Sequence, residues 1–128
     1  MADSKKSTMS QILIIDDDQS VRSAMSDVLS HHSYYVFTAE NGKKAVDIIA
    51  QENIALVLLD IYMPEKDGIE TIADIRKKYP HLPVIAMSGN TDPIYAPLLY
   101  IEALGANATL TKPFNADILL NCIRQHLN

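Results

Sequence analysis

Short apolar runs that alternate with helical patterns constrain the fold of this chain more than any other feature. Five runs rich in β-branched residues and leucine are typical of buried strands, namely residues 12–15, 35–39, 55–59, 84–87 and 108–111. A helical pattern separates each run from the next. This repeated βαβ arrangement predicts an α/β fold with a parallel sheet covered by helices on both faces.

Four of the helical segments have a clear apolar face, and three of them follow a residue that can cap a helix. Asp18, Asp67 and Asn115 precede the first, third and last helices, and their side-chain oxygens can accept hydrogen bonds from the free N–H groups of a first turn. We therefore expect Asp18 to be a cap and not a metal ligand. The last helix is expected to bury Ile118, Leu119, Cys122, Ile123 and Leu127.

The connection between the fourth and fifth strands has an irregular pattern. Pro97 would remove an interior hydrogen bond from a helix that started near Pro93. We expect an irregular stretch over residues 90–96 and then a short helix over residues 97–104, closed by Gly105. This is the segment that we expect to move or vary most.

Two of the apolar runs end abruptly in aspartate. Asp16 and Asp17 follow the first run, and Asp60 follows the third. Because open α/β sheets bind ligands beside the carboxyl ends of their strands, we expect the three side chains to converge. Crowded carboxylates raise one another's pKa unless a cation compensates them, so a hard ion such as Mg²⁺ is their natural partner.

The composition removes several other classes of protein. A chain of 128 residues with 48% hydrophobic content fits one domain with an ordinary core. A net charge of -5, with scattered Lys and Arg residues, argues against nucleic-acid binding. Cys122 is the only cysteine, so no internal disulfide can form and a cytoplasmic location is the simplest interpretation.

The first ten residues differ from the rest of the chain. Residues 1–10 contain Lys5 and Lys6 but are not followed by an apolar segment long enough for a signal peptide or a membrane span. We expect a loosely ordered tail over residues 1–10, a folded domain over residues 11–128 and no membrane insertion. The tail favours a complete stand-alone protein over a fragment, whereas the end of the chain after the last helix fits both.

Two more polar residues stand at predicted strand ends, and the whole set suits phosphoryl transfer. Asp60 could act as an oxygen nucleophile if a cation removes the repulsion between it and an anionic donor. Lys112 could neutralise one phosphoryl oxygen, and the hydroxyl group of Ser88 could donate a hydrogen bond to another.

These residues stand in motifs that resemble the receiver domains of two-component response regulators, similar to the stand-alone CheY type. The resemblance covers nearly everything after the tail. It rests on Ile14-Ile15-Asp16-Asp17-Asp18, on Leu58-Leu59-Asp60 with Met63-Pro64 and Asp67-Gly68, on Met87-Ser88-Gly89, and on Lys112-Pro113-Phe114.

The resemblance implies a doubly wound, flavodoxin-like sheet of five strands in the order 2-1-3-4-5. It implies that Asp60 takes a phosphoryl group from a histidine of a sensor kinase or phosphotransfer protein. Mg²⁺ would be held by Asp16, Asp17, Asp60 and the backbone carbonyl of Tyr62, and Ser88 would move toward the phosphoryl group. Such a chain catalyses only its own phosphorylation and dephosphorylation, and it signals by contact with an unidentified downstream protein.

Two features depart from the family pattern. Thr109 stands where the family has a switch aromatic, three residues before Lys112, and the segment between Ser88 and Lys112 is slightly longer than usual. Tyr95 or Tyr100 could report phosphorylation instead. Tyr62 is a large residue two positions after the acceptor, and our hypothesis is that it shields the acyl phosphate from water.

Two alternative functions remain open. The first is a protein-interaction module that has the receiver fold and works without phosphorylation, although the complete acidic site counts against it. The second is a phosphohydrolase of the haloacid dehalogenase kind. That class needs a second acid two residues after its nucleophile, where this chain has Tyr62, so turnover of an external substrate is not expected.

Overall fold

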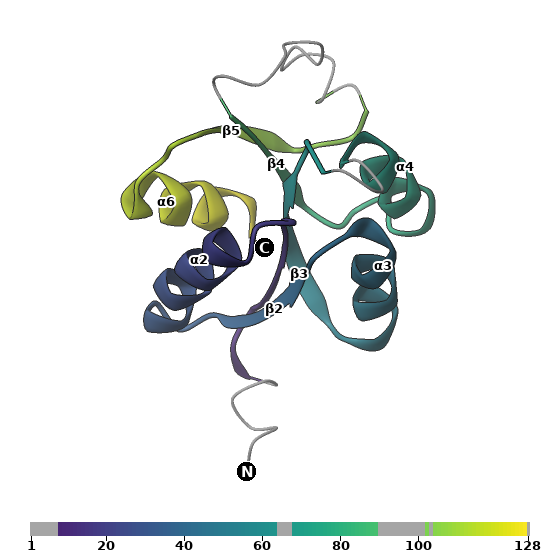
Figure 1. Cartoon of the computed structure of the whole chain (residues 1–128). Helices are drawn as coiled ribbons and strands as arrows, with labels where there is room; N and C mark the ends of the chain where they lie inside the picture. Colours follow the sequence, from purple (N-terminus) through teal and green to yellow (C-terminus); the bar gives the residue numbers. More distant parts are fainter. Residues whose placement is uncertain (1–7, 64–67, 90–101, 103, 128) are drawn as a thin grey trace.

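The computed structural model describes residues 8–63, 68–89, 102 and 104–127, and within them it contains a five-stranded sheet (Figure 1). The strands occur in the order β2-β1-β3-β4-β5, and every neighbouring pair is parallel. This confirms the predicted doubly wound fold. The elements are β1 (Gln11–Ile15), α2 (Gln19–His31), β2 (Tyr35–Ala39), α3 (Gly42–Gln51), β3 (Ile54–Asp60), α4 (Gly68–Lys78), β4 (Val84–Gly89), β5 (Ala108–Lys112) and α6 (Ala116–His126).

The helices cover the two faces of the sheet in pairs. Helices α2 and α6 lie on one face, and α3 and α4 lie on the other (Figure 1). Alternate residues of β1 enter the two cores: Leu13 and Ile15 join the core under α3 and α4, whereas Ile12 and Ile14 join the core under α2 and α6. Because both faces of the strand are covered, its sequence is apolar from Ile12 to Ile15, which is the signal that predicted it.

Two of the predicted helix caps are present. The Oδ1 atom of Asp18 accepts hydrogen bonds from the N–H groups of Ser20 at 2.8 Å and Val21 at 3.4 Å, so Asp18 begins α2. Asn115 accepts a hydrogen bond from the N–H of Ile118 at 2.9 Å and begins α6 in the same way. The predicted cap at Asp67 lies outside the described residues.

The prediction that α6 buries Ile118 is wrong, because 49% of this residue is exposed. Each residue of an α-helix is turned by about 100° from the one before it, and Ile118 points away from the face that contains Leu119 and Ile123. Cys122 is half-buried against the same core. Ala24 and Ala50, at the margins of the apolar faces of α2 and α3, are exposed as well.

The predicted irregular stretch and short helix before β5 fall mostly on residues 90–101 and 103, outside the described part of the chain. Gly105, expected to close that helix, has a φ of 120°, and its N–H donates to the carbonyl of Glu102 at 3.0 Å. Arg76 of α4 donates to the carbonyl oxygens of Gly105 at 2.7 Å and Leu82 at 2.6 Å. This side chain therefore links the end of α4 to the segments that lead into β4 and β5.

None of the helices in the described residues combines the length and the hydropathy that a membrane span requires. The prediction of a loosely ordered tail concerns residues 1–10, of which residues 1–7 lie outside the description.

Candidate functional site

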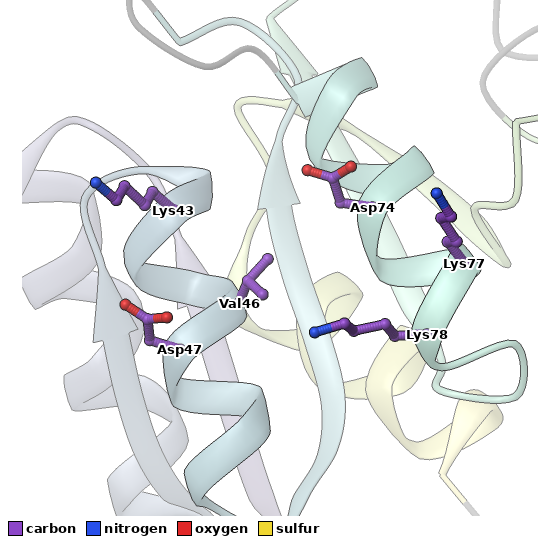
Figure 2. Close-up of a pocket in the computed structure, with 6 residues that line it drawn as sticks. All are labelled: Lys43, Val46, Asp47, Asp74, Lys77 and Lys78. Carbon is purple, nitrogen blue, oxygen red and sulfur yellow. The ribbon is translucent and has the colours of Figure 1, made fainter.

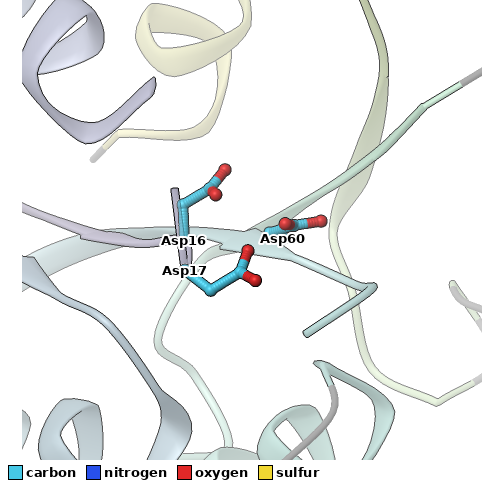
Figure 3. A group of neighbouring side chains, drawn as sticks. All are labelled: Asp16, Asp17 and Asp60. Atoms are coloured by element: carbon cyan, nitrogen blue, oxygen red, sulfur yellow. The ribbon is translucent and has the colours of Figure 1, made fainter. Parts of the chain in front are cut away.

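The three aspartates predicted to converge do so at the carboxyl edge of the sheet. Strands β1 and β3 are neighbours, and their register pairs Ile15 with Leu59, so that the next residues along the chain, Asp16 and Asp60, come side by side. One carboxylate oxygen from each of Asp16, Asp17 and Asp60 lies within 4.8 Å of the others (Figure 3). Two connections along the chain separate these residues, and the sheet order brings them together.

Lys112 reaches this group from β5, the strand at the edge of the sheet. Its Nζ atom lies 2.8 Å from the Oδ2 atom of Asp16 and 3.7 Å from the Oδ2 atom of Asp60. The peptide bond that follows, between Lys112 and Pro113, is cis. One ammonium group thus contacts two of the three carboxylates.

Asp60 is a buried carboxylate whose pKa is raised by its surroundings. It is only 6% exposed, and burial, together with the neighbouring charge of Asp16, raises its pKa to about 6. Lys112 and a hydrogen bond of 3.1 Å from the N–H of Tyr62 to the Oδ1 atom act against this rise in pKa. Asp60 is therefore ionised at neutral pH, but its negative charge destabilises the folded chain.

The carboxylate partners of Lys112 keep its amine protonated. Burial alone would lower the pKa of this amine, but the hydrogen bond to Asp16 and the charge of Asp60 outweigh burial and raise the pKa above its ordinary value. Lys112 therefore remains a cation over the whole physiological range, as a group that neutralises a phosphoryl oxygen must.

Ser88 stands near the group, and Tyr62 joins it through its backbone N–H. The register of β3 and β4 pairs Asp60 with Met87, so Ser88 lies one residue further along β4. Among the described hydrogen bonds, none joins the Ser88 hydroxyl to a carboxylate of the group. The Tyr62 side chain is half-buried and packs against the core under α3 and α4.

Two residues support the site in ways that the sequence predictions did not include, and one of them, Gly68, entered those predictions only as part of the Asp67-Gly68 motif. Arg22 donates from Nη1 to the backbone carbonyl of Asp16 at 2.6 Å. Gly68 lies so close to the end of β3 that an added Cβ would be 2.6 Å from the carbonyl oxygen of Asp60. The sequence offered a weak signal for each, namely an arginine one turn into α2 and a glycine at the start of α4.

The donor set fits a hard divalent cation. Three carboxylates supply the oxygen ligands that Mg²⁺ prefers, and the exposure of Asp17 leaves room for water and phosphoryl oxygens in the remaining positions. Of the described residues with metal-binding side chains, these are the ones that gather closely enough to share an ion.

A separate cavity of about 560 Å³ lies between α3 and α4, away from the acidic group (Figure 2). Val46 is its apolar part, and the charged side chains of Lys43, Asp47, Asp74, Lys77 and Lys78 surround it. It contains none of the residues that the sequence analysis selected, so its size does not identify it as the functional site.

Comparisons with known proteins agree with this fold. The family model of the response regulator receiver domain matches residues 12–124. The chain is 34% identical over 120 residues to the response regulator protein FleR of Pseudomonas aeruginosa, covering 91% of this chain and 24% of FleR. It is also 34% identical to the autoinducer sensor kinase/phosphatase CqsS of Vibrio cholerae, covering 87% of this chain and 16% of CqsS. The chain thus spans a quarter or less of the length of these relatives.

Among solved structures, the likeness extends over the whole length of two chains. The chemotaxis protein CheY4 of Vibrio cholerae has a TM-score of 0.85 and 29% identity, with 94% of this chain and 100% of CheY4 covered. The response regulator TrrA of Thermotoga maritima, solved with Mg²⁺ and BeF, has a TM-score of 0.82 and 30% identity, with 93% and 100% covered.

Proposed function

The chain belongs to the response regulator receiver family, and we propose that it is a phosphorylatable signalling receiver whose acceptor is Asp60. The phosphoryl donor is a histidine of a partner sensor kinase or phosphotransfer protein. The proposal assigns the receiver to residues 11–128, leaves residues 1–10 outside it and sets its action in the cytoplasm.

One observation carries the proposal. Asp16, Asp17 and Asp60 come together at the end of two neighbouring strands, and Lys112 contacts two of them from a third strand. A purely structural role does not account for this crowding, because the raised pKa of Asp60 means that its charge is costly in the folded state. A site that receives a cation and then a phosphoryl group accounts for it.

Each residue of the site has one role in the proposed reaction. A carboxylate oxygen of Asp60 forms a bond to phosphorus while the P–N bond to the donor imidazole breaks. The electron pair of the P–N bond returns to the imidazole, which begins protonated on its other nitrogen and leaves neutral. Lys112 pairs with one phosphoryl oxygen, and the Ser88 hydroxyl donates to another.

Asp16, Asp17, Asp60 and the backbone carbonyl of Tyr62 would hold Mg²⁺. When bound, this ion neutralises the charge between the carboxylates and the phosphoryl oxygens. Asp60 is covered by neighbouring groups and Asp17 faces solvent, so the donor reaches the site from the Asp17 side. The result of the reaction passes to a downstream protein by contact, and the chain acts on no external substrate.

Incubation with acetyl phosphate and Mg²⁺, followed by intact-mass measurement, tests the proposal. We expect one phosphoryl adduct in the wild-type chain, no adduct when EDTA replaces Mg²⁺, and no adduct in Asp60→Asn. A wild-type chain that gains no adduct from this donor or from a phosphorylated histidine phosphotransfer protein would reject the proposal and favour the phosphorylation-independent interaction module.

A further inference from the structure

Every polar atom of Asp16 has a partner in the structure. The backbone N–H donates to the carbonyl of Ala39 at 3.1 Å. The side chain accepts hydrogen bonds from the N–H of Asp18 at 3.0 Å and from Nζ of Lys112 at 2.8 Å. The remaining atom, the backbone carbonyl oxygen, accepts the 2.6 Å hydrogen bond from Arg22. Asp16 itself is fully buried, whereas its partners Lys112 and Arg22 are partly exposed.

Asp17 is held much less firmly than its neighbour. Its side chain is exposed, and no described residue hydrogen-bonds to its carboxylate. The carbonyl of Asp16 and the N–H of Asp17 belong to the same planar peptide unit. A group that fixes the Asp16 carbonyl therefore fixes that plane and limits the direction in which the Asp17 side chain leaves the backbone.

Arg22 is well placed to fix this plane. It lies in the first turn of α2, where its own N–H donates to the carbonyl of Asp18 at 3.0 Å, so its backbone is anchored to the same acidic turn. Its side chain also lines a cavity of about 260 Å³ together with Glu40 and Lys44. The ion pair between Glu40 and Lys44 lowers the pKa of Glu40, and the charge of Arg22 adds to that effect.

We propose that Arg22 is a positioning residue that orients Asp17 for Mg²⁺ through its hydrogen bond to the Asp16 carbonyl. The inference rests on the proposed function for the identity of the ion. By orienting Asp17, Arg22 strengthens Mg²⁺ binding, whereas its positive charge alone would weaken it.

The positioning role of Arg22 and its positive charge predict opposite changes in Mg²⁺ affinity when the residue is removed. If Arg22 acted on the site only through its positive charge, its removal would strengthen the binding of a divalent cation, because one repulsive charge would be lost. If Arg22 positions Asp17, its removal weakens binding, since the free peptide unit must be ordered when the ion binds. The sign of the change in Mg²⁺ affinity therefore distinguishes the two hypotheses.

The test is the Mg²⁺ affinity of Arg22→Ala and Arg22→Lys, measured by titration of backbone amide NMR signals. We expect Arg22→Ala to bind Mg²⁺ about tenfold more weakly, as is usual when a group that supports a metal ligand is lost. Arg22→Lys keeps the charge on a side chain that ends one bond earlier, so its affinity also falls, by a smaller factor. Arg124→Ala, which removes an exposed arginine of α6, serves as the matched control and leaves the affinity unchanged.

A second measurement needs neither Mg²⁺ nor phosphorylation. In the metal-free chain, the N–H of Asp18 donates to Asp16, and we expect it to exchange with solvent faster in Arg22→Ala while the core strands are unaffected. An unchanged exchange rate, or an Mg²⁺ affinity in Arg22→Ala that equals or exceeds the wild-type value, overturns the inference. Failure of the wild-type chain to bind Mg²⁺ would instead overturn the proposed function, and the exchange rates would still decide whether Arg22 orders the turn.

Discussion

Lys112 donates a hydrogen bond from its Nζ atom to the Oδ2 atom of Asp16 at 2.8 Å, although β5 and β1 are separated in the sheet by β3 and β4. Asp60, at the end of β3, lies between them, and its Oδ2 atom is 3.7 Å from the same Nζ atom. Among the described residues, Lys112 is the cation that forms ion pairs with the acidic group. The positive charge of this ammonium group therefore offsets much of the repulsion among the three carboxylates in the metal-free chain.

Replacement of Lys112 by alanine is expected to lower the free energy of unfolding by about 1–3 kcal/mol in Mg²⁺-free buffer at pH 7. The change leaves Asp16 and Asp60 buried without their cation, and the partial exposure of Lys112 reduces the loss below that of a fully buried pair. Urea denaturation provides the measurement. Lys77→Ala, at an exposed position of α4, is the control and should change stability by less than about 0.5 kcal/mol.

Replacement of Asp60 by asparagine is expected to raise the free energy of unfolding by about 2 kcal/mol at pH 7 without Mg²⁺. The pKa of Asp60 is about 6 in the folded chain and near 3.8 when unfolded, so its ionisation costs stability above pH 6. That cost falls as the pH falls from about 6 toward 3.8, because the folded state takes up a proton first. Denaturation at several pH values should show the advantage of Asp60→Asn shrinking over this window, and a constant difference between pH 7 and pH 4 would contradict the explanation.

Mg²⁺ binding is expected to weaken as the pH falls below about 6. A ligand carboxylate must be ionised to coordinate the ion, and protons compete for Asp60 below the pKa that burial and Asp16 give it. At pH 5 the apparent affinity should be about tenfold lower than at pH 7. Titration of amide NMR signals at both pH values provides the measurement. In Asp60→Asn this step near pH 6 should disappear, while the affinity is lower throughout.

Replacement of Tyr62 by alanine is expected to accelerate loss of the phosphoryl group from Asp60. The Tyr62 N–H donates a hydrogen bond to the Oδ1 atom of Asp60 at 3.1 Å, and the Tyr62 side chain is half-buried. The shielding hypothesis holds that this ring limits the access of water to the acyl phosphate. The hydrolysis rate of the purified phosphoprotein should rise by a factor of about 3, or about 0.6 kcal/mol in the barrier. Tyr62→Phe keeps the ring and should keep the wild-type rate. An unchanged rate in Tyr62→Ala would reject the shielding hypothesis.

Replacement of Gly68 by alanine is expected to damage both the fold and the site. The new Cβ would collide with the backbone at the end of β3, 2.6 Å from the carbonyl oxygen of Asp60 and 2.9 Å from that of Ile61. Backbone atoms cannot rotate away, so either α4 or the acceptor residue must shift, at a cost of about 2 kcal/mol or more in stability. Thermal unfolding and Mg²⁺ titration should both detect the change, and a variant with wild-type values in both would show that the first turn of α4 accommodates a side chain.

The prediction of the strands succeeded where the signal was local and strong. A strand covered on both faces has a nearly continuous run of apolar residues, so β1 and β3 could be recognised without any knowledge of their neighbours. The caps at Asp18 and Asn115 are equally local, since each side chain bonds to an N–H group only a few residues away. The burial of Ile118 was mispredicted because spacing shows that apolar residues share a helix without showing where the covered face ends.

The sequence by itself determined that acidic residues follow two buried strands and that a serine and a lysine follow two others, because a strand end is marked by the change from apolar to polar residues. Only the tertiary structure decided that Lys112 spans two strands to reach Asp16, that the pKa of Asp60 rises to about 6, and that Arg22 binds the carbonyl of Asp16. These properties depend on distances between atoms that are brought together by the order of the strands. Electrostatic and hydrogen-bond energies change steeply over a few ångströms, and sequence spacing does not specify such distances between residues on different strands.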